Sequence, residues 1–214
     1  MTTAPRGLSR ALLAAFGLAT AVDLVSLLAG AEPGHQIAKA LLMPLLAAYA
    51  VTRGAPRPLT AALLLGWGGD VFLLSDADGA FLVGMGCFAA GHVCYLVLFG
   101  RRHTSPALGA LYAAALAGTV LLLWPDLPAD LRVPVAGYSL LLTAMAYRAS
   151  SLGLLTGLGG ALFLLSDTLI ATGVAEWPRL PAHDFWVMLT YIAAQYLLTA
   201  GTLRAMYGER RTTV

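Results

Sequence analysis

The sequence has few charged residues. Of its 214 residues, 13 are lysine or arginine and 11 are aspartate or glutamate, which together make 11% of the chain. Soluble domains carry about 25% charged residues, because their outer faces must be polar. With 59% hydrophobic residues and a mean hydropathy of +0.78, the chain has too few polar residues to cover the surface of a soluble domain of this size. The composition therefore predicts an integral membrane protein.

Two further shortages exclude other classes. The net charge is only +2 and no basic tract is present, so the sequence offers nothing for nucleic acid to bind. Cys87 and Cys94 are seven residues apart in one expected helix, which puts their Cα atoms about 10 Å apart, too far for a disulfide. Their spacing fits neither a zinc site nor a redox Cys-x-x-Cys pair. We interpret them as apolar packing residues.

What the sequence has in abundance is apolar runs of about 17–25 residues, the length of membrane-spanning helices. The breaks between them are short and rich in glycine, proline and charge. We predict an all-α integral membrane protein, a single polytopic membrane domain over residues 1–214 that forms a bundle of about eight transmembrane helices. The predicted spans are residues 9–30, 37–52, 58–74, 81–99, 106–124, 131–149, 152–173 and 184–206.

Basic residues predict the orientation. Ten of the 13 lysines and arginines fall at the chain termini or in the breaks after the second, fourth and sixth spans. Basic residues favour the cytoplasmic side, so we expect a multi-pass protein of the cell (inner) membrane with both termini in the cytoplasm. The first apolar run lacks a convincing cleavage site, and we interpret it as a span rather than a removed signal peptide.

One stretch, Gly66 to Asp76 (GWGGDVFLLSD), places the carboxylate of Asp70 inside an apolar run. Residues 157–167 (GLGGALFLLSD) are identical to it at eight of eleven positions. The offset of 91 residues covers four spans, which suggests a parallel internal repeat of spans 3–4 and 7–8. Chance similarity of two Gly- and Leu-rich segments is the alternative. Identity aligns Asp76 with Asp167, whereas depth in the membrane aligns Asp70 with Asp167.

Ionisable residues inside a membrane are costly and by default suggest a functional site. At about 1.5 Å per residue, Asp70 lies about 18 Å from Pro58 and Asp167 about 24 Å from Ser151, which puts both in the expected outer half. The polar residues of this layer form one predicted cluster: Asp23, Lys39, Asp70, His92, Asp167, Tyr191 and Gln195. Tyr95, one turn from His92, and Ser166, beside Asp167, complete the candidate site.

These residues also have purely structural interpretations. Asp23 could be a rim acid or could neutralise Lys39, and Lys39 could reach the headgroups. His92 could be an interior histidine with satisfied hydrogen bonds. Tyr191 and Gln195 could be interhelical hydrogen-bonding residues.

The remaining acids divide into two kinds. Asp70 and Asp167 could be paired structurally with Lys39 or His92. We expect Asp76 and Asp78 to be solvated loop residues. The glycines before Asp70 are expected to allow close helix contact.

At these residues the chain resembles the YhhN family of multi-span membrane proteins, the lysoplasmalogenases. The resemblance covers almost the whole chain and is carried by Lys39 with 43–46, 69–74, Phe81 with Gly84, Phe88 with 91–95, 160–168 and 191–195. It implies cleavage of the vinyl-ether bond of lysoplasmalogen (lysoplasmenyl-ethanolamine or -choline) to a fatty aldehyde and a glycerophospho-alcohol. A lysophospholipid substrate within membrane lipids is implied, and no metal or organic cofactor.

This reaction suits two buried acids. Protonation of the β-carbon of a vinyl ether gives an oxocarbenium ion, which water attacks. One group must still hold a proton near neutral pH and another must be a carboxylate, and two acids in different low-dielectric settings supply both. We predict Asp70 and Asp167 as the catalytic pair, without assigning the proton, and His92 as a water orienter or second base. The predicted substrate-binding residues are Lys39 (for the phosphate), Asp23, Tyr95, Ser166, Tyr191 and Gln195.

Two other functions fit part of the pattern. Buried acids in a parallel repeat suit a small-molecule or proton-coupled transporter or binding protein, although no pair of helices broken by Gly or Pro occupies matching positions. The segment 67–70 (WGGD) resembles the Gly-x-Gly-Asp pattern of intramembrane aspartyl proteases, but Trp67 replaces the first glycine and the chain has no Tyr-Asp pair.

Overall fold

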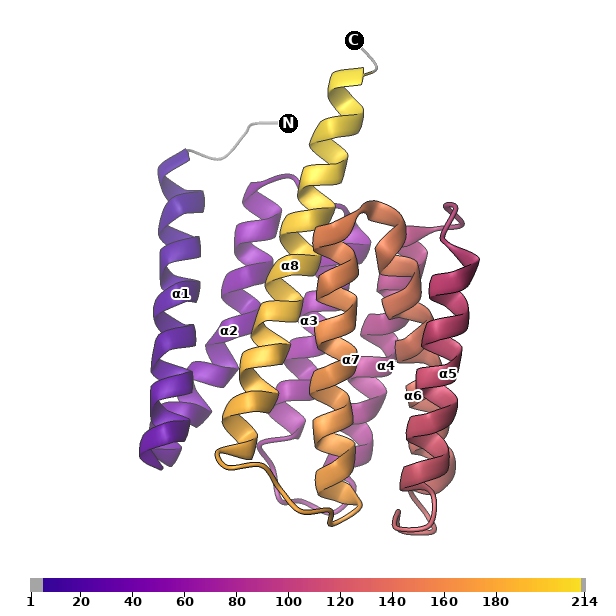
Figure 1. Cartoon of the computed structure of the whole chain (residues 1–214). Helices are drawn as coiled ribbons and strands as arrows, with labels where there is room; N and C mark the ends of the chain where they lie inside the picture. The colour runs from indigo at the N-terminus through magenta and orange to yellow at the C-terminus, as the bar shows by residue number, and fades with distance from the viewer. Residues whose placement is uncertain (1–5, 213–214) are drawn as a thin grey trace. The chain divides into compact units, whose positions relative to one another are not determined.

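The computed structural model describes residues 6–212, with side chains described from residue 7 to residue 208. The side chains of Arg6, Arg210 and Arg211, which the orientation prediction counts, lie outside this range. Within it the chain forms eight α-helices and no strand, which confirms the predicted all-α class (Figure 1). The elements are α1 (Arg6–Ala29), α2 (Glu32–Thr52), α3 (Arg57–Phe72), α4 (Ala80–Phe99), α5 (Pro106–Leu123), α6 (Arg132–Ala149), the 3-10 turn η1 (Ser150–Leu152), α7 (Leu154–Val174) and α8 (His183–Thr212).

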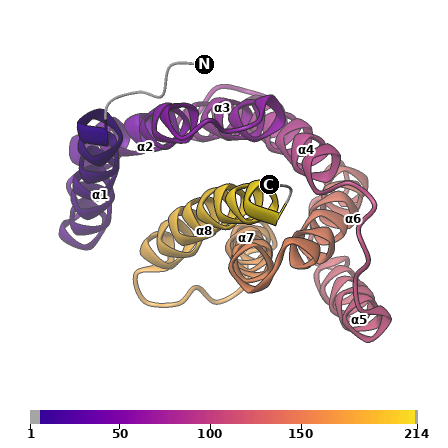
Figure 2. The same ribbon diagram turned by 90° about the horizontal axis from the view of Figure 1, so that it is seen from above.

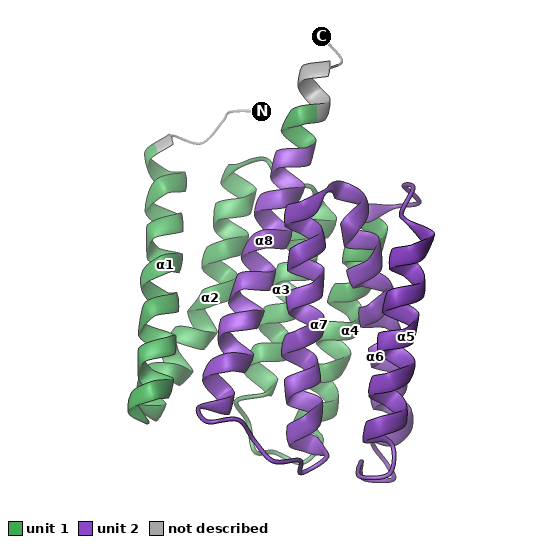
Figure 3. Cartoon of the chain, in the orientation of Figure 1, with its two compact units in different colours: residues 1–98, 206–214 green, residues 99–205 purple. Residues whose placement is uncertain are grey.

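The helices group into two compact units (Figure 3). Unit 1 consists of residues 1–98 and 206–214, and unit 2 of residues 99–205. In unit 1, helices α1 to α4 follow one another side by side in a row, and in unit 2 helices α5 to α8 do the same (Figure 2). Short connections between successive helices make neighbours antiparallel, so each unit is a row of up-and-down helices.

Proline and glycine mark the helix ends, as the breaks in the sequence indicated. Helices α2, α3 and α5 each have a proline in the first turn, where the missing N–H costs nothing. The residue after α2 is followed by Gly54 at φ +74°, and α7 begins after Gly153 at φ +115°. Residues with a side chain rarely adopt such φ values, so glycine suits the turn after α2 and the start of α7.

The distribution of side chains is the reverse of that in a soluble protein. Leu121 on α5 and Leu154 on α7 are 73% and 78% exposed, whereas Asp23, Asp70 and His92 are at most 2% exposed. Exposure of these leucines to water would be unfavourable, whereas hydrocarbon accommodates them. Ionisable groups in a bilayer face the protein interior. The fold therefore defines a multi-pass helical membrane protein.

Five of the described helices, α1, α4, α5, α7 and α8, are long and apolar enough to cross a membrane. The prediction that α2, α3 and α6 also cross it stays a prediction. Helix α3 has 16 residues, about 24 Å of helix, which is shorter than the hydrocarbon core of about 30 Å. The internal repeat and the single-domain organisation likewise stay predictions.

Glycines let the helices of unit 2 approach closely. A Cβ atom on Gly160 of α7 would lie 2.8 Å from the Cα of Ala146 on α6. A Cβ on Gly201 of α8 would lie 2.6 Å from Cγ2 of Thr156 on α7. Small residues of this kind allow backbone contact between membrane helices, so α7 is packed tightly on two sides.

We expect Gly160→Ala to destabilise the protein by about 1–3 kcal/mol, because the added methyl group meets backbone atoms that cannot move aside. The matched control is Gly118→Ala on α5, where a Cβ would meet nothing within 4 Å. The control should leave stability unchanged or raise it slightly. Thermal unfolding in detergent measures both variants. Equal midpoints for the two would contradict close packing at Gly160.

Candidate functional site

In unit 1, the carboxylate of Asp23 on α1 is fully buried and lies against α2. Its Oδ1 is 2.9 Å from Nδ1 of His35, whereas Oδ2 is buried and makes no hydrogen bond. The two helices are close here, since a Cβ on Gly34 would lie 2.3 Å from Oγ of Ser26. The partner of Asp23 is therefore His35, a residue that the sequence analysis did not single out, rather than Lys39.

Lys39 lies one turn after His35 on α2 and is buried, with 9% of its surface exposed. Residues four apart share a helix face, so both basic side chains lie on the same face of α2. The role predicted for Lys39, binding the phosphate of the lipid headgroup, stays a prediction.

Asp70 lies near the end of α3 and is 2% exposed. The preceding residue, Gly69, is covered by α4, because a Cβ there would lie 2.5 Å from the ring of Phe88. On the other side of α3, Nε1 of Trp67 donates a hydrogen bond of 2.9 Å to the carbonyl of Ala40 on α2. The glycine before Asp70 therefore allows close helix contact, as expected, and the segment is fixed to both neighbouring helices.

His92 and Tyr95 on α4 are each 1% exposed. The register of α4 on α3 is fixed at Gly91, where a Cβ would lie 3.2 Å from the carbonyl oxygen of Ala62. Ala62 precedes Asp70 by eight residues, which is about 12 Å along the helix axis. The backbone of His92 thus lies about two helical turns from that of Asp70 in depth, and a role of His92 in the proposed site stays a prediction.

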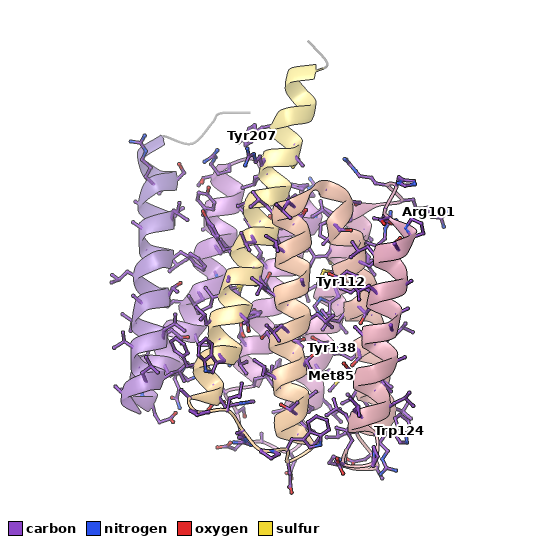
Figure 4. The ribbon with its side chains drawn as sticks, in the orientation of Figure 1. Met85, Arg101, Tyr112, Trp124, Tyr138 and Tyr207 are labelled. Carbon is purple, nitrogen blue, oxygen red and sulfur yellow. The ribbon has the colours of Figure 1, made fainter. Side chains whose placement is uncertain are left out.

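In unit 2, Asp167 on α7 is half-buried, and the hydroxyl of Tyr138 on α6 donates a hydrogen bond to its Oδ2. Figure 4 shows Tyr138 between Arg101, at one end of the unit, and Trp124, at the other. The sequence analysis missed Tyr138, because a lone tyrosine in an apolar run resembles many lipid-facing aromatic residues. Its partner is 29 residues away in the chain, so no local sequence pattern predicts the pair.

Tyr191 and Gln195 on α8 are both buried, and Nε2 of Gln195 donates a hydrogen bond of 3.3 Å to the hydroxyl of Tyr191. The ring of Tyr191 packs edge-on against Phe163 of α7, with centroids 5.5 Å apart. The hydroxyl of Ser166 donates to the carbonyl of Val187, at 3.1 Å. These contacts hold α7 and α8 in register, and a role of the three polar residues in binding substrate stays a prediction.

The two acids that follow α3 differ from Asp70. Asp76 and Asp78 lie in the loop before α4 and are exposed, as expected for solvated residues. Asp70 and Asp167 both lie within helices. The alignment by depth, which pairs Asp70 with Asp167, stays a prediction.

Among the described residues, no three histidine, cysteine, aspartate or glutamate side chains come together in a way that could hold a metal ion. Cys87 and Cys94 are free thiols on α4, in keeping with a packing role.

The chain is a multi-pass helical membrane protein with one carboxylate inside α3 and another inside α7. Residues 34–202 match the model of the YhhN family, and the chain belongs to this family. The resemblance noted in the sequence is thereby confirmed. Helix α1, with Asp23, lies outside the matched residues.

Several relatives carry the name lysoplasmalogenase. The chain is 37% identical to lysoplasmalogenase TMEM86B of Homo sapiens over 152 residues, which cover 71% of this chain and 66% of that protein. It is 42% identical to the Sus scrofa protein of that name over 142 residues, covering 66% and 61%. Identity to the lysoplasmalogenase of Mycobacterium tuberculosis is 33% over 209 residues, covering 87% and 79%.

The chain thus spans slightly less than two thirds of the length of these mammalian relatives. No solved structure matches it.

We expect His35→Ala to lower the free energy of unfolding by about 1–3 kcal/mol, because it leaves the buried carboxylate of Asp23 without its hydrogen-bond partner. His103→Ala is the matched control, since His103 is exposed in the loop between α4 and α5. Unfolding in detergent followed by circular dichroism measures the difference. A His35→Ala protein as stable as His103→Ala would show that the pair contributes nothing.

Proposed function

We propose that this protein hydrolyses the vinyl-ether bond of lysoplasmalogens and releases a fatty aldehyde and glycerophosphoethanolamine or glycerophosphocholine. One observation carries the proposal: a membrane protein related to proteins named lysoplasmalogenase holds carboxylates within two helices, Asp70 on α3 and Asp167 on α7. A buried carboxylate at Asp70 and a half-buried one at Asp167 suit a reaction that needs an acid and a base. The proposal requires both acids to reach the same substrate.

The reaction begins with proton transfer. One carboxylic acid protonates the β-carbon of the vinyl ether, the double bond is lost, and the α-carbon and ether oxygen share the positive charge of an oxocarbenium ion. The other carboxylate stabilises this cation electrostatically. Glycosidases use two carboxylates around a similar oxocarbenium-like state, and an interior of low dielectric strengthens the attraction.

Water completes the reaction. The carboxylate removes a proton from water as the oxygen attacks the α-carbon, which gives a hemiacetal. The first acid, now ionised, takes the hydroxyl proton of the hemiacetal, and the second gives its new proton to the departing glycerol oxygen. The products are aldehyde and alcohol, one water is consumed, and both acids return to their starting states. General acid–base catalysis of this kind contributes about 10²–10⁴-fold.

The remaining candidate residues would bind the lysolipid. Its vinyl ether lies just below the phosphate, so a basic residue near the membrane rim orients the headgroup, a role we assign to Lys39. Tyr191 and Gln195 would hold the glycerol or the departing oxygen. Asp23, Tyr95 and Ser166 would shape the surroundings, with His92 as a water orienter or second base. We also propose that the protein lies in the inner membrane with both termini in the cytoplasm.

The test is aldehyde release from lysoplasmenylethanolamine by the purified protein. We expect turnover by the wild type and a loss of about 10²-fold or more in Asp70→Asn and in Asp167→Asn, since each loses an acid or base. Aldehyde is measured with a coupled dehydrogenase, and folding is checked by size-exclusion chromatography.

The matched control is Asp76→Asn, which removes an exposed loop carboxylate that the sequence repeat aligns with Asp167. This variant should retain wild-type activity. Folded Asp70→Asn or Asp167→Asn protein with near-normal rates would refute the paired-acid mechanism. A wild type that transports the lysolipid and releases no aldehyde would refute the hydrolase and support the transporter alternative.

A further inference from the structure

The contact between Asp23 and His35 in unit 1 leaves the second ring nitrogen of His35 available. Oδ1 of Asp23 is 2.9 Å from Nδ1 of the histidine, which orients the ring and directs Nε2 away from the carboxylate. The side chain of His35 is 14% exposed. Among the described residues Nε2 makes no hydrogen bond, and it is not enclosed by protein atoms. His35 therefore presents a polar atom that can bind a ligand.

Lys39 presents a second polar atom from the same face of α2. The residue is 9% exposed, and among the described residues its ammonium group has no hydrogen bond or ion pair. A largely buried cation without a partner is unfavourable. Helical side chains lean toward the N-terminus of their helix, and Lys39 follows His35 by one turn. Its long side chain therefore extends toward the level of the imidazole ring.

The charges of Asp23, His35 and Lys39 determine which ligand this cluster can bind. Asp23 is 0% exposed, so a ligand would meet the two nitrogens and not the carboxylate. In the imidazolium form, which an ionised carboxylate stabilises, both ring nitrogens donate, Nδ1 to Asp23 and Nε2 to a ligand. The cluster then contains one anion and two cations, and a ligand with one negative charge would balance them.

One further acid lies close by in the sequence. Glu32, one turn before His35 in the first turn of α2, is exposed and among the described residues forms no ion pair with His35 or Lys39. It therefore leaves both basic groups available.

The surroundings of the cluster favour a lipid over a soluble anion. Apolar residues on both helices, at positions next to the cluster in the sequence, are between 49% and 65% exposed: Val25, Leu28, Ile37 and Leu41. Such residues suit contact with hydrocarbon chains. Helix α1 has 24 residues, about 36 Å, which exceeds the hydrocarbon core of about 30 Å. Its end, close to the cluster, therefore reaches the level of the lipid phosphates.

We propose that His35 and Lys39 bind the phosphate of the lysophospholipid, and that Asp23 is a positioning residue that holds His35 for this task. This inference rests on the proposed function for the kind of lipid, and it adds His35 as a second phosphate-binding residue. The phosphodiester carries one negative charge, so the occupied site is electrically neutral. All three residues belong to unit 1, and α1, which supplies Asp23, lies outside the residues that match the family model.

The first test measures binding of lysophosphatidylethanolamine, which has the headgroup but no vinyl ether, to the purified protein by calorimetry in detergent. A monoacylglycerol with the same chain has no phosphate and is the reference lipid. Lys39→Gln and His35→Ala should each weaken binding of the lysolipid about tenfold or more, because each removes a charged donor. Asp23→Asn should weaken it about threefold or more, because the imidazolium loses its charged partner. Binding of the monoacylglycerol should stay within about twofold.

Two matched variants control for charge. Lys39→Arg keeps the positive charge and should bind the lysolipid within about threefold of the wild type. Arg57→Gln also removes one positive charge, but Arg57 is exposed at the start of α3, near the other end of α2, and this variant should bind as the wild type does. Lys39→Gln loses no hydrogen bond within the protein, so it tests the site even if His35→Ala does not fold.

A purely structural role for the cluster would weaken binding of both lipids alike. Folded Lys39→Gln protein that binds the lysolipid as tightly as the wild type, or that loses the same affinity for both lipids, would overturn the inference.

Glycerophosphoethanolamine, which has the phosphodiester but no chain, distinguishes a lipid from a soluble phosphate ester. We expect it to bind at least about tenfold more weakly than the lysolipid, since the chain contributes apolar contacts. Binding as tight as that of the lysolipid, and lost in Lys39→Gln, would mark a site for a soluble ester and overturn the lipid assignment.

Aldehyde release from lysoplasmenylethanolamine separates this inference from the proposed function. Phosphate-dependent binding that requires His35 and Lys39, without aldehyde release by the wild type, would refute hydrolysis and support the phosphate site. Aldehyde release with an unchanged KM in both Lys39→Gln and His35→Ala would refute the phosphate site and support hydrolysis.

Discussion

Hydrocarbon cannot solvate a charge or an unpaired polar group, and this constraint governs the structure. A charged side chain within a membrane span must face the protein and find a partner there. The described residues show the two forms that this takes. Asp23 contacts a histidine across the α1–α2 contact, at 2.9 Å, and Asp167 accepts a hydrogen bond from Tyr138 across the α6–α7 contact. Each partner comes from the neighbouring helix, so the packing of helices decides which acids can exist in the interior.

Glycine makes that packing possible. Membrane helices gain little from burying apolar surface against one another, because lipid is equally apolar, and they rely on close contact. Gly69 lies under Phe88 in unit 1, and Gly160 lies against Ala146 in unit 2. In unit 1 this glycine directly precedes the buried Asp70, and in unit 2 it lies seven residues, about two turns, before the half-buried Asp167. The feature that holds the helices together therefore also shapes the surroundings of the groups proposed for catalysis.

Much of this could be read from the sequence, for physical reasons. Apolar runs of membrane length predict helices because an isolated segment in lipid must satisfy its own backbone hydrogen bonds. An aspartate in such a run stands out, and Asp70 and Asp167 were identified in this way. His35 and Tyr138 were not. His35 follows a Pro-Gly pair that resembles a loop, yet α2 begins before it, at Glu32, and the partner of Tyr138 is distant in sequence.

Depth within the bundle was harder to predict than the presence of a helix. Counting residues from the helix ends could not relate the depth of His92 to that of Asp70, whereas the contact between Gly91 and Ala62 places their backbones about two turns apart. The register of neighbouring helices depends on which small residues contact each other, and a single sequence does not show which residues of different helices are in contact.

The most direct measurement of the central claim is the isotope content of the aldehyde formed in heavy water. If an acid protonates the β-carbon of the vinyl ether, the aldehyde released from lysoplasmenylethanolamine will carry one deuterium on the carbon next to the carbonyl group. Mass spectrometry of the rapidly trapped product detects it. Aldehyde without this deuterium, or no aldehyde from the folded wild-type protein, would contradict the account.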